Sequence, residues 1–417
     1  MRRADVTTQS TEALLDRQDE RLRGSAGRGG PLREIFDDLR SGNVSVLPVV
    51  IGLIIIAIVF QSLNPLFLSS QNLVNLLLES AALGTIALGV TFVLLLGQID
   101  LSVGSLSGLS AAVLAVLFVR MELPVAIAIG AALALAALIG FLYAAIFNRI
   151  GVPSFVITLG GLLAFLGLQL YILGPSGAIN LPYDSSLVRF AQLAFVPAWL
   201  SYVFVALAGA GLFLSGFGKS RARRAAGLSA ASMGALILRS GVGTLLLLAA
   251  VWYLNRARGV GWMFVFFLVL VLVMHYMLRR TRWGRHMFAV GGSKEAARRA
   301  GIKVRAIYTS GFVLSATFAA MGGILAASRL AAANQSSGGG DVNLNAIAAA
   351  VIGGTSLFGG RGSALGALFG VLVIQAISNG LTLLNLTSSY RFMVTGAVLL
   401  LAVALDAMSR RSRADRV

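Results

Sequence analysis

Cysteine is absent from the 417-residue chain, and histidine occurs only twice, at His275 and His286. The lack of thiols excludes disulfides, thiolate nucleophiles and cysteine-ligated metals, and two histidines leave little material for a metal site. Charged residues are also scarce, at 12% of the chain, which is about half the share in a soluble domain. These shortages exclude a soluble globular protein, and we expect no metal and no cofactor.

Long apolar runs take the place of the missing polar residues. Each is about 18 to 25 residues long, enough to cross a hydrocarbon layer of about 30 Å. The sequence therefore predicts an all-α polytopic integral membrane protein with about 10 to 12 transmembrane helices. The runs beginning at 73, 101 and 343 contain glycine and polar residues, so we expect one or two to be broken or re-entrant. The twelve runs lie at about 47–63, 73–97, 101–119, 124–147, 154–173, 196–217, 236–254, 260–278, 306–328, 343–358, 363–385 and 391–408.

The net charge of +18 lies between the apolar runs. In a soluble chain this charge would suggest nucleic acid, but cytoplasmic loops of membrane proteins collect Lys and Arg, so we expect no nucleic-acid partner. With the N-terminus inside, 20 basic residues fall in loops and tail on its side, and six fall opposite. This asymmetry predicts a bilayer topology with both ends in the cytoplasm.

The two ends differ in composition from the apolar body. Residues 1–45 hold eight arginines and eight acids, and we expect a flexible cytoplasmic leader there. Residues 46–408 form the predicted transmembrane domain, and 409–417 a basic cytoplasmic tail.

Two segments of the chain resemble each other. Gly97–Gly104 and Gly353–Gly360 are both glycine-rich interruptions, and each leads into a run with small residues four apart. Those small residues are Gly104 and Gly108 in the first copy, and Gly362, Gly366 and Gly370 in the second. A duplicated broken helix that enters a close-packed helix is typical of transporters with internal repeats. Similar composition of glycine-rich transmembrane helices explains the pattern equally well.

Acidic residues inside apolar runs mark candidate sites, because an ionised carboxylate in the bilayer must face protein, water or an interface. Glu79 and Asp100 are two such residues, and Asp100 lies in the densest polar cluster of any apolar stretch, surrounded by Gln98, Ser102, Ser105 and Ser107. Our candidates for the translocation pathway are the four residues Gln98, Asp100, Ser102 and Ser105. A second and compatible interpretation is that Asp100 caps the helix starting near Leu101.

The segment 279–305 carries nine basic residues and one acid. Ser293 is a good N-cap, Ala296, Ala297 and Ala300 favour a helix, and Gly301 is the expected stop. We therefore predict an exposed helix of about two turns that docks a cytoplasmic partner. A solvated basic loop would explain the charge but not the ordered cap, helix and stop.

No enzyme motif is apparent. Gly216–Ser220 resembles the end of a phosphate-binding loop, but Phe213 stands where the first glycine is required. The sequence offers no paired catalytic acids and no nucleophile motif. We predict a transport subunit with no catalytic residues, so any ATP must be hydrolysed by a separate subunit.

Four motifs in order carry a resemblance to a known family: Gly97–Gly104 (GQIDLSVG), Gly151–Gly160 (GVPSFVITLG), Gly284–Gly301, and Ala346–Gly362 (AIAAAVIGGTSLFGGRG). With these, the chain resembles the bacterial ABC-importer permeases for ribose, xylose, arabinose and galactose, which are related to branched-chain amino-acid permeases. The resemblance covers about residues 45–408. Family-variable material at 190–260 is similar to that of the xylose permeases.

The resemblance implies a function and partners. We expect the permease of a binding-protein-dependent sugar importer in the bacterial inner membrane, with D-xylose or a related monosaccharide as cargo. It implies a permease homodimer, a periplasmic sugar-binding protein outside and a cytoplasmic ABC ATPase inside. The family's coupling segment maps onto 284–301, with Gly284, Gly292, Ser293, Glu295, Ala296, Ala297, Ala300 and Gly301 as candidates. For docking of the binding protein we favour Arg189, Arg329, Asn334, Gln335 and Asp341.

Other transport functions remain open at this point. Asp100 or Glu79 could carry a proton in a secondary transporter that needs no partner. Within the importers, ribose, arabinose or a branched-chain amino acid could replace xylose. A channel is disfavoured because no selectivity motif is apparent.

Overall fold

The computed structural model describes residues 47–227, 230–387, 389–390, 393–394, 396–397 and 400. Across these residues, nine helices are long and apolar enough to cross a membrane, and two shorter apolar helices, Val49–Leu63 and Asp341–Ile352, accompany them. The prediction of an all-α polytopic membrane protein is therefore confirmed. The leader 1–45, the tail 409–417 and most of the run 391–408 lie outside the described residues.

The chain divides into two compact units. The smaller one is built from Val196–Gly259, and the larger one contains Pro48–Phe195 and the chain from Val260 onward. The smaller unit nearly coincides with the predicted insertion at 190–260, although the domain division itself stays a prediction.

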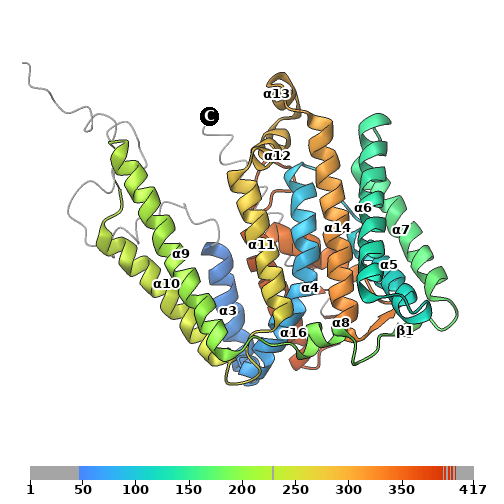
Figure 1. Ribbon diagram of the computed structural model, residues 1–417, viewed down its shortest axis with the longest axis horizontal. Coiled ribbons are helices and arrows are strands. Elements are labelled where there is room, and N and C mark those ends of the chain that lie inside the picture. The colour runs from blue at the N-terminus through green and yellow to red at the C-terminus, as the bar shows by residue number, and fades with distance from the viewer. Residues whose placement is uncertain are drawn as a thin grey trace, which may run out of the picture. The chain divides into compact units, whose positions relative to one another are not determined.

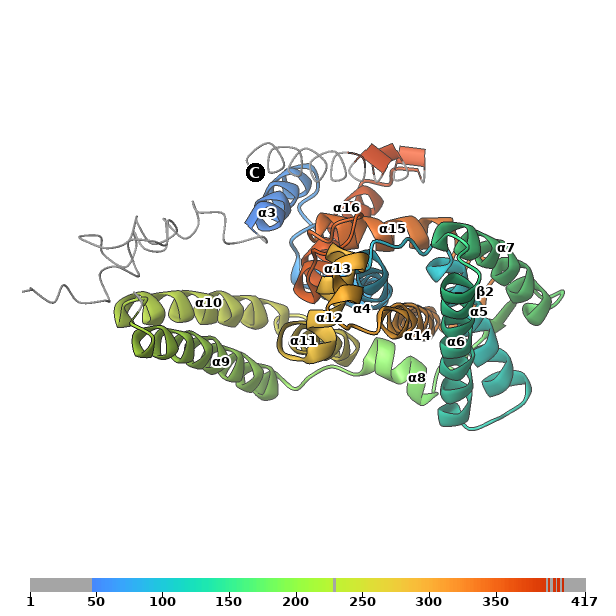
Figure 2. The ribbon, with the colours of Figure 1, turned by 90° about the horizontal axis from the view of Figure 1, so that it is seen from above.

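The smaller unit is a hairpin of two long helices, α9 (Ala198–Ala225) and α10 (Met233–Leu254), which run side by side (Figures 1 and 2). The Ser232 side chain caps α10 by accepting a hydrogen bond from the Ala235 N–H. At the other end of the hairpin, the Asn255 side-chain amide donates to Ser201 Oγ at 3.0 Å. Most of the apolar side chains on both helices are exposed, as expected for a surface that faces lipid.

The larger unit is centred on two buried helices, α4 and α14, which pack along each other. Figure 2 shows α14 between α4 and α6, with α5 beside α6. The elements of this unit are α3 (Leu47–Leu63), α4 (Ser70–Leu95), α5 (Val103–Ala115), η1 (Val116–Arg120), α6 (Val125–Arg149), α7 (Ser154–Leu173), β1 (Ala178–Asn180), α8 (Ser186–Val188), η2 (Arg189–Leu193), α11 (Trp262–Arg280), α12 (Arg282–Gly292), α13 (Lys294–Arg299), α14 (Val304–Leu330), β2 (Ala332–Asn334), α15 (Gly340–Ile352) and α16 (Ala364–Leu383).

Of the three runs in which glycine and polar residues suggested a break, one is interrupted. The run beginning at 73 is a continuous helix, α4, and the run beginning at 101 is helical from Val103 to Arg120. A break at residues 96–102 separates these two helices. The run beginning at 343 is interrupted, because α15 ends at Ile352 and a glycine-rich loop replaces the remainder. The glycines within α4 serve close packing instead of a break, since a Cβ on Gly89 would lie 2.8 Å from Phe318 Cβ.

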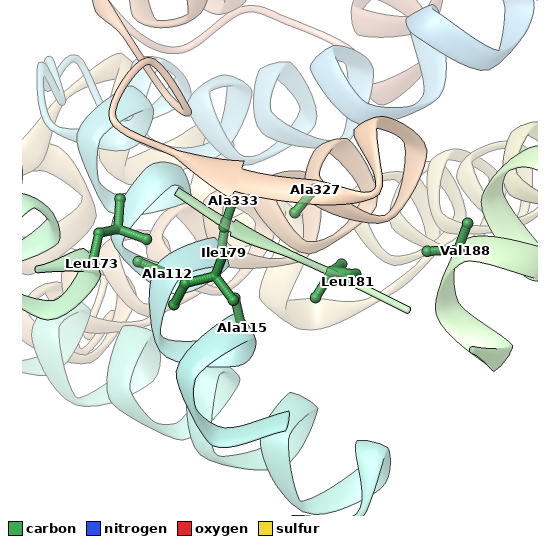
Figure 3. Packing of buried hydrophobic residues seen from close by; sticks show 9 residues of the cluster. Ala112, Ala115, Leu173, Ile179, Leu181, Val188, Ala327 and Ala333 are labelled. Atoms are coloured by element: carbon green, nitrogen blue, oxygen red, sulfur yellow. The ribbon is translucent and has the colours of Figure 1, made fainter. Parts of the chain in front are cut away.

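A short antiparallel ribbon joins two loops that are far apart in sequence. Strand β1 follows α7, strand β2 follows α14, and Ile179 pairs with Ala333. Side chains from α5, α7, α14 and both strands form a buried apolar cluster under the ribbon (Figure 3). The ribbon therefore fixes the loop after α14 against α5.

Candidate functional site

The break at residues 96–102 is held by side chains from neighbouring helices. The Ile99 N–H donates to Ser154 Oγ at 3.3 Å, and the Leu101 N–H donates to Thr158 Oγ1 at 3.1 Å. The Asn343 amide donates to the Leu101 carbonyl oxygen at 2.8 Å. Non-helical backbone within a membrane protein needs such partners, because lipid supplies none. Helices α7 and α15 thus stabilise the broken segment.

Asp100 is the centre of a buried hydrogen-bond network at this break. Its side chain is 2% exposed, and Oδ1 accepts from the Ser102 N–H at 2.9 Å and the Ser102 hydroxyl at 2.8 Å. Oδ2 accepts from the Ser315 hydroxyl on α14 at 3.1 Å, and the Tyr143 hydroxyl on α6 donates to Ser102 Oγ at 3.0 Å. The carboxylate therefore ties the start of α5 to α6 and α14.

A cavity of about 290 Å³, lined by apolar and polar residues, lies in the larger unit. Its walls come from α4, α5, α14, α16 and the segment that leads into α15. The volume is close to the lower end of the roughly 300–1,000 Å³ range of small-molecule sites. The polar residues among its lining are Glu79, Ser107, Arg329, Ser336, Ser337, Asp341 and Gln375.

An ion pair lies in the wall of this cavity. Arg329 Nη2 on α14 lies 3.0 Å from Glu79 Oε1 on α4, and both side chains are partly buried. The second acid of the cavity, Asp341, is exposed in the first turn of α15. The cavity therefore presents two carboxylates and one guanidinium, together with neutral hydroxyl and amide groups.

A close backbone contact shapes one wall. The segment that leads into α15 crosses α5 at Gly108, where a Cβ would overlap the carbonyl oxygen of Ser337. Gln169 on α7 holds the same segment, because its side-chain amide donates to the carbonyl oxygens of Asn334 and Ser337, each at 2.9 Å. Only glycine at this point of α5 lets Ser337 reach the cavity.

None of the four predicted pathway residues lines this cavity. Ser102 and Ser105 are buried, and the Ser105 hydroxyl donates to the Ser102 carbonyl oxygen at 3.0 Å. Gln98 is half-buried in the break. The next serine of α5, Ser107, points to another face of the helix and does line the cavity. The assignment of the four residues to the pathway stays a prediction.

The predicted docking helix at 293–301 is confirmed as a helix. Ser293 caps α13 by accepting from the Ala296 N–H, and Gly301 follows the helix with a φ of +80°. The helix was predicted to be exposed, but the Ala297 side chain packs inward and is only 4% exposed. A preceding helix, α12, was not predicted, although Thr281 caps it through the Gly284 N–H.

Helix α12 ends against the first break. A Cβ on Gly291 would overlap the carbonyl oxygen of Leu95 and would lie 2.8 Å from the Gly360 nitrogen. The Gly360 N–H in turn donates to the Leu95 carbonyl oxygen at 2.9 Å. The two glycine-rich segments that resemble each other in sequence thus meet at the end of α12.

Three of the predicted outer docking residues, Arg189, Asn334 and Gln335, adjoin α8 or β1, which lie in Figure 1 at the opposite end of the larger unit from α12 and α13. Arg189 is exposed in η2, and Gln335 is exposed after β2. Asn334 pairs with Ala178 in the ribbon. Arg329 and Asp341 line the cavity, and Asp341 is also exposed. Their role in docking stays a prediction.

Residues 72–403 match the family model described as "Branched-chain amino acid transport system / permease component". The chain is 35% identical to the xylose transport system permease protein XylH of Escherichia coli over 378 residues, which is 90% of this chain and 95% of the relative. It is 31% identical to XylH of Haemophilus influenzae, over 89% of this chain and 99% of the relative. The ribose import permease protein RbsC of Escherichia coli is 32% identical, over 85% of this chain and 92% of the relative. No solved structure matches the chain significantly.

Proposed function

The chain belongs to the family of branched-chain amino acid transport system permease components, and on that premise we propose that it is the membrane permease of an ATP-driven importer for D-xylose or a related monosaccharide. It is a multi-pass membrane protein and a transport subunit without catalytic activity of its own. The observation that carries the choice of sugar is the 35% identity to XylH across 90% of the chain. The ribose permease is similar over a smaller share of the chain, 85%.

The cargo passes through the cavity between α4, α5, α14 and α15. Hydroxyl and amide groups such as those of Ser107, Ser337 and Gln375 exchange hydrogen bonds with the hydroxyls of a sugar, and each contact is weak enough to release it. Gln98, Asp100, Ser102 and Ser105 border the same route at the break. High selectivity is not required here, because the delivering protein has already chosen the sugar.

A separate ABC ATPase binds the coupling segment 284–301. Closure of its nucleotide domains pushes on α13, and α12 transmits the push to the two glycine-rich segments that meet at Leu95 and Gly360. The exposed faces of α13 and the packing of Gly291 support this route. Gly284, Gly292, Ser293, Glu295 and Gly301 shape the segment, and Ala296 and Ala300 offer its surface.

The remaining assembly follows from the same premise. Two copies of the chain sit in the bacterial inner membrane with both termini in the cytoplasm. A periplasmic sugar-binding protein docks at the opposite end from α13, where its acids meet Arg189 and neighbouring polar groups. The excess of basic residues on the side of the N-terminus supports this orientation.

Reconstitution tests the proposal directly. The permease is placed in proteoliposomes with its ATPase and binding protein, and uptake of labelled D-xylose is measured with and without ATP, with ribose and leucine as competitors. We expect ATP-dependent xylose uptake that needs all three components. Uphill uptake by the permease alone, driven by a pH gradient, would contradict the proposal. Stronger competition by ribose or leucine than by unlabelled xylose would reassign the cargo.

A further inference from the structure

The smaller unit carries positive charge without any acid to balance it. Residues 196–259 contain seven Lys and Arg residues and no Asp or Glu. The nearest acids along the chain are Asp184 and Glu295. No acidic side chain of the hairpin can pair with these cations, so the negative charge that balances them must come from outside the hairpin.

Part of this charge surrounds a cavity of about 110 Å³ between the last turns of α9 and the first turn of α10. Arg221 and Arg224 are three residues apart and share one face of α9. They line the cavity together with Phe217, Ser220, Met233 and Leu236. The lining is mainly apolar, and the two arginines of α9 are its charged residues.

Local contacts hold Ser220 and Arg224 to the loop that precedes α10. Arg224 Nη2 donates to the Ala231 carbonyl oxygen at 3.4 Å, and the Ser220 hydroxyl donates to the same oxygen at 3.1 Å. A guanidinium has five N–H donors, so this bond leaves others for a ligand. The 22-residue helix α10 also begins here, and its N-terminal dipole favours an anion.

The position of the cavity along the hairpin points to the membrane surface. Helix α9 has 28 residues and is about 42 Å long, which exceeds the roughly 30 Å of the hydrocarbon layer. Its last turns therefore extend into the headgroup region. The faces below the cavity expose large apolar side chains, such as Leu214 at 65% and Ile237 at 56%, which acyl chains can cover.

From these observations we propose that the hairpin binds the phosphodiester headgroup of an anionic phospholipid between Arg221 and Arg224. The two guanidinium groups and the start of α10 take the phosphate, and Phe217, Met233 and Leu236 take the first carbons of the acyl chains. Basic residues that only follow the general charge asymmetry of membrane proteins would need no cavity and would not distinguish one arginine pair from another. The site is independent of the transported solute.

Native mass spectrometry of the full-length protein tests this site. The protein in neutral detergent is titrated with dioleoylphosphatidylglycerol, dioleoylphosphatidylcholine or sn-glycerol 3-phosphate. We expect retention of phosphatidylglycerol alone, and at least about tenfold weaker retention in Arg221→Gln/Arg224→Gln, because two charge-assisted contacts are lost. The matched control is Arg256→Gln/Arg258→Gln, which removes two charges at the other end of the hairpin. We expect this control variant to retain phosphatidylglycerol as the unmodified protein does.

A second variant keeps both arginines. Leu236→Trp fills the cavity from α10, and we expect it to weaken retention of phosphatidylglycerol at unchanged charge. The proposal would be overturned if both double arginine variants lost phosphatidylglycerol equally, or if Leu236→Trp retained it fully. Either result would indicate diffuse electrostatic attraction between the basic residues and the lipid. Retention of glycerol phosphate as tight as that of the lipid would also overturn it, because a soluble phosphate would then be the ligand.

Discussion

At the scale of single residues, the larger unit contains two carboxylates with different surroundings. Asp100 accepts three hydrogen bonds inside a buried network, whereas Glu79 forms an ion pair in the wall of the cavity. A buried acceptor that loses its donors costs about 1–3 kcal/mol, so Asp100 contributes to the stability of the break whatever else it does. Each acid can be tested separately.

Asp100→Asn separates a pathway role from a purely structural one. The amide oxygen can still accept from the Ser102 N–H, and the Ser315 hydroxyl can turn to accept from the new NH₂ group, so we expect little change in thermal unfolding. If the carboxylate borders the route, ATP-driven xylose uptake falls. Both quantities are measured on one preparation, with Asp100→Ala as the control that lowers stability by about 1–3 kcal/mol. Unaltered uptake in Asp100→Asn would leave Asp100 as a structural residue.

The Glu79–Arg329 ion pair is tested by exchange. Arg329→Gln leaves a carboxylate without its cation in the cavity wall, and we expect a several-fold loss of xylose uptake. The double variant Glu79→Arg/Arg329→Glu restores the pair and part of the rate. Binding of the sugar-loaded periplasmic protein to proteoliposomes is measured alongside. Lost docking in Arg329→Gln, without recovery in the exchanged pair, would instead support the predicted docking role of Arg329.

At the scale of elements, α13 combines a short helix with one inward residue. Ala297 anchors it, and the Ile302 N–H donates to the Ala297 carbonyl oxygen at 3.1 Å. Ala296 and Ala300 are exposed. A charge at Ala297 would therefore disturb packing within the chain, while a charge at Ala296 or Ala300 would act on whatever docks there.

Ala296→Asp/Ala300→Asp is the resulting test of the coupling segment. We expect the ATPase to lose co-purification with the permease, because two unpaired carboxylates would be buried in the interface. Ala306→Asp, an exposed position in the first turn of α14, is the matched control and should keep the ATPase. Normal co-purification of the double variant would place the ATPase contact elsewhere.

At the scale of the whole molecule, the hairpin Val196–Gly259 enters and leaves the larger unit at one point. Phe195 forms an antiparallel bridge with Gly261, and the Trp262 N–H donates to the Ala194 carbonyl oxygen at 3.0 Å. Bridged residues have Cα atoms about 4.5–5.5 Å apart. The two ends of the larger unit's chain that flank the hairpin are therefore hydrogen-bonded to each other.

Excision of the hairpin tests whether the larger unit folds without it. Replacing residues 197–258 with a Gly-Ser linker should leave a permease that inserts into the membrane and co-purifies with the ATPase, because the flanking residues already lie side by side. Membrane fractionation and co-purification measure the outcome, with full-length protein as the control. Aggregation of the shortened chain would show that the larger unit needs the hairpin to fold.

The sequence alone predicted the features that depend on residues close together in the chain. Apolar run length predicted the membrane helices, and Ser293 with Gly301 predicted α13, since a cap and a stop act within a few residues. The partners of Asp100 were missed, because Tyr143 and Ser315 lie 41 and 215 positions from the residues they contact. The predicted apolar run 306–328 ends just before Arg329, yet α14 extends to Leu330 and places Arg329 in an ion pair with Glu79. Long-range packing decides such contacts.

The charge balance of the cavity bears on what happens after entry. Glu79 and Asp341 outnumber Arg329, so the charged groups of the cavity are negative overall. A sugar that is phosphorylated in the cytoplasm gains about −1.5 to −2 charges, which these carboxylates would repel. If the cavity is the pathway that we propose for the sugar, its charge therefore opposes the return of the phosphorylated product.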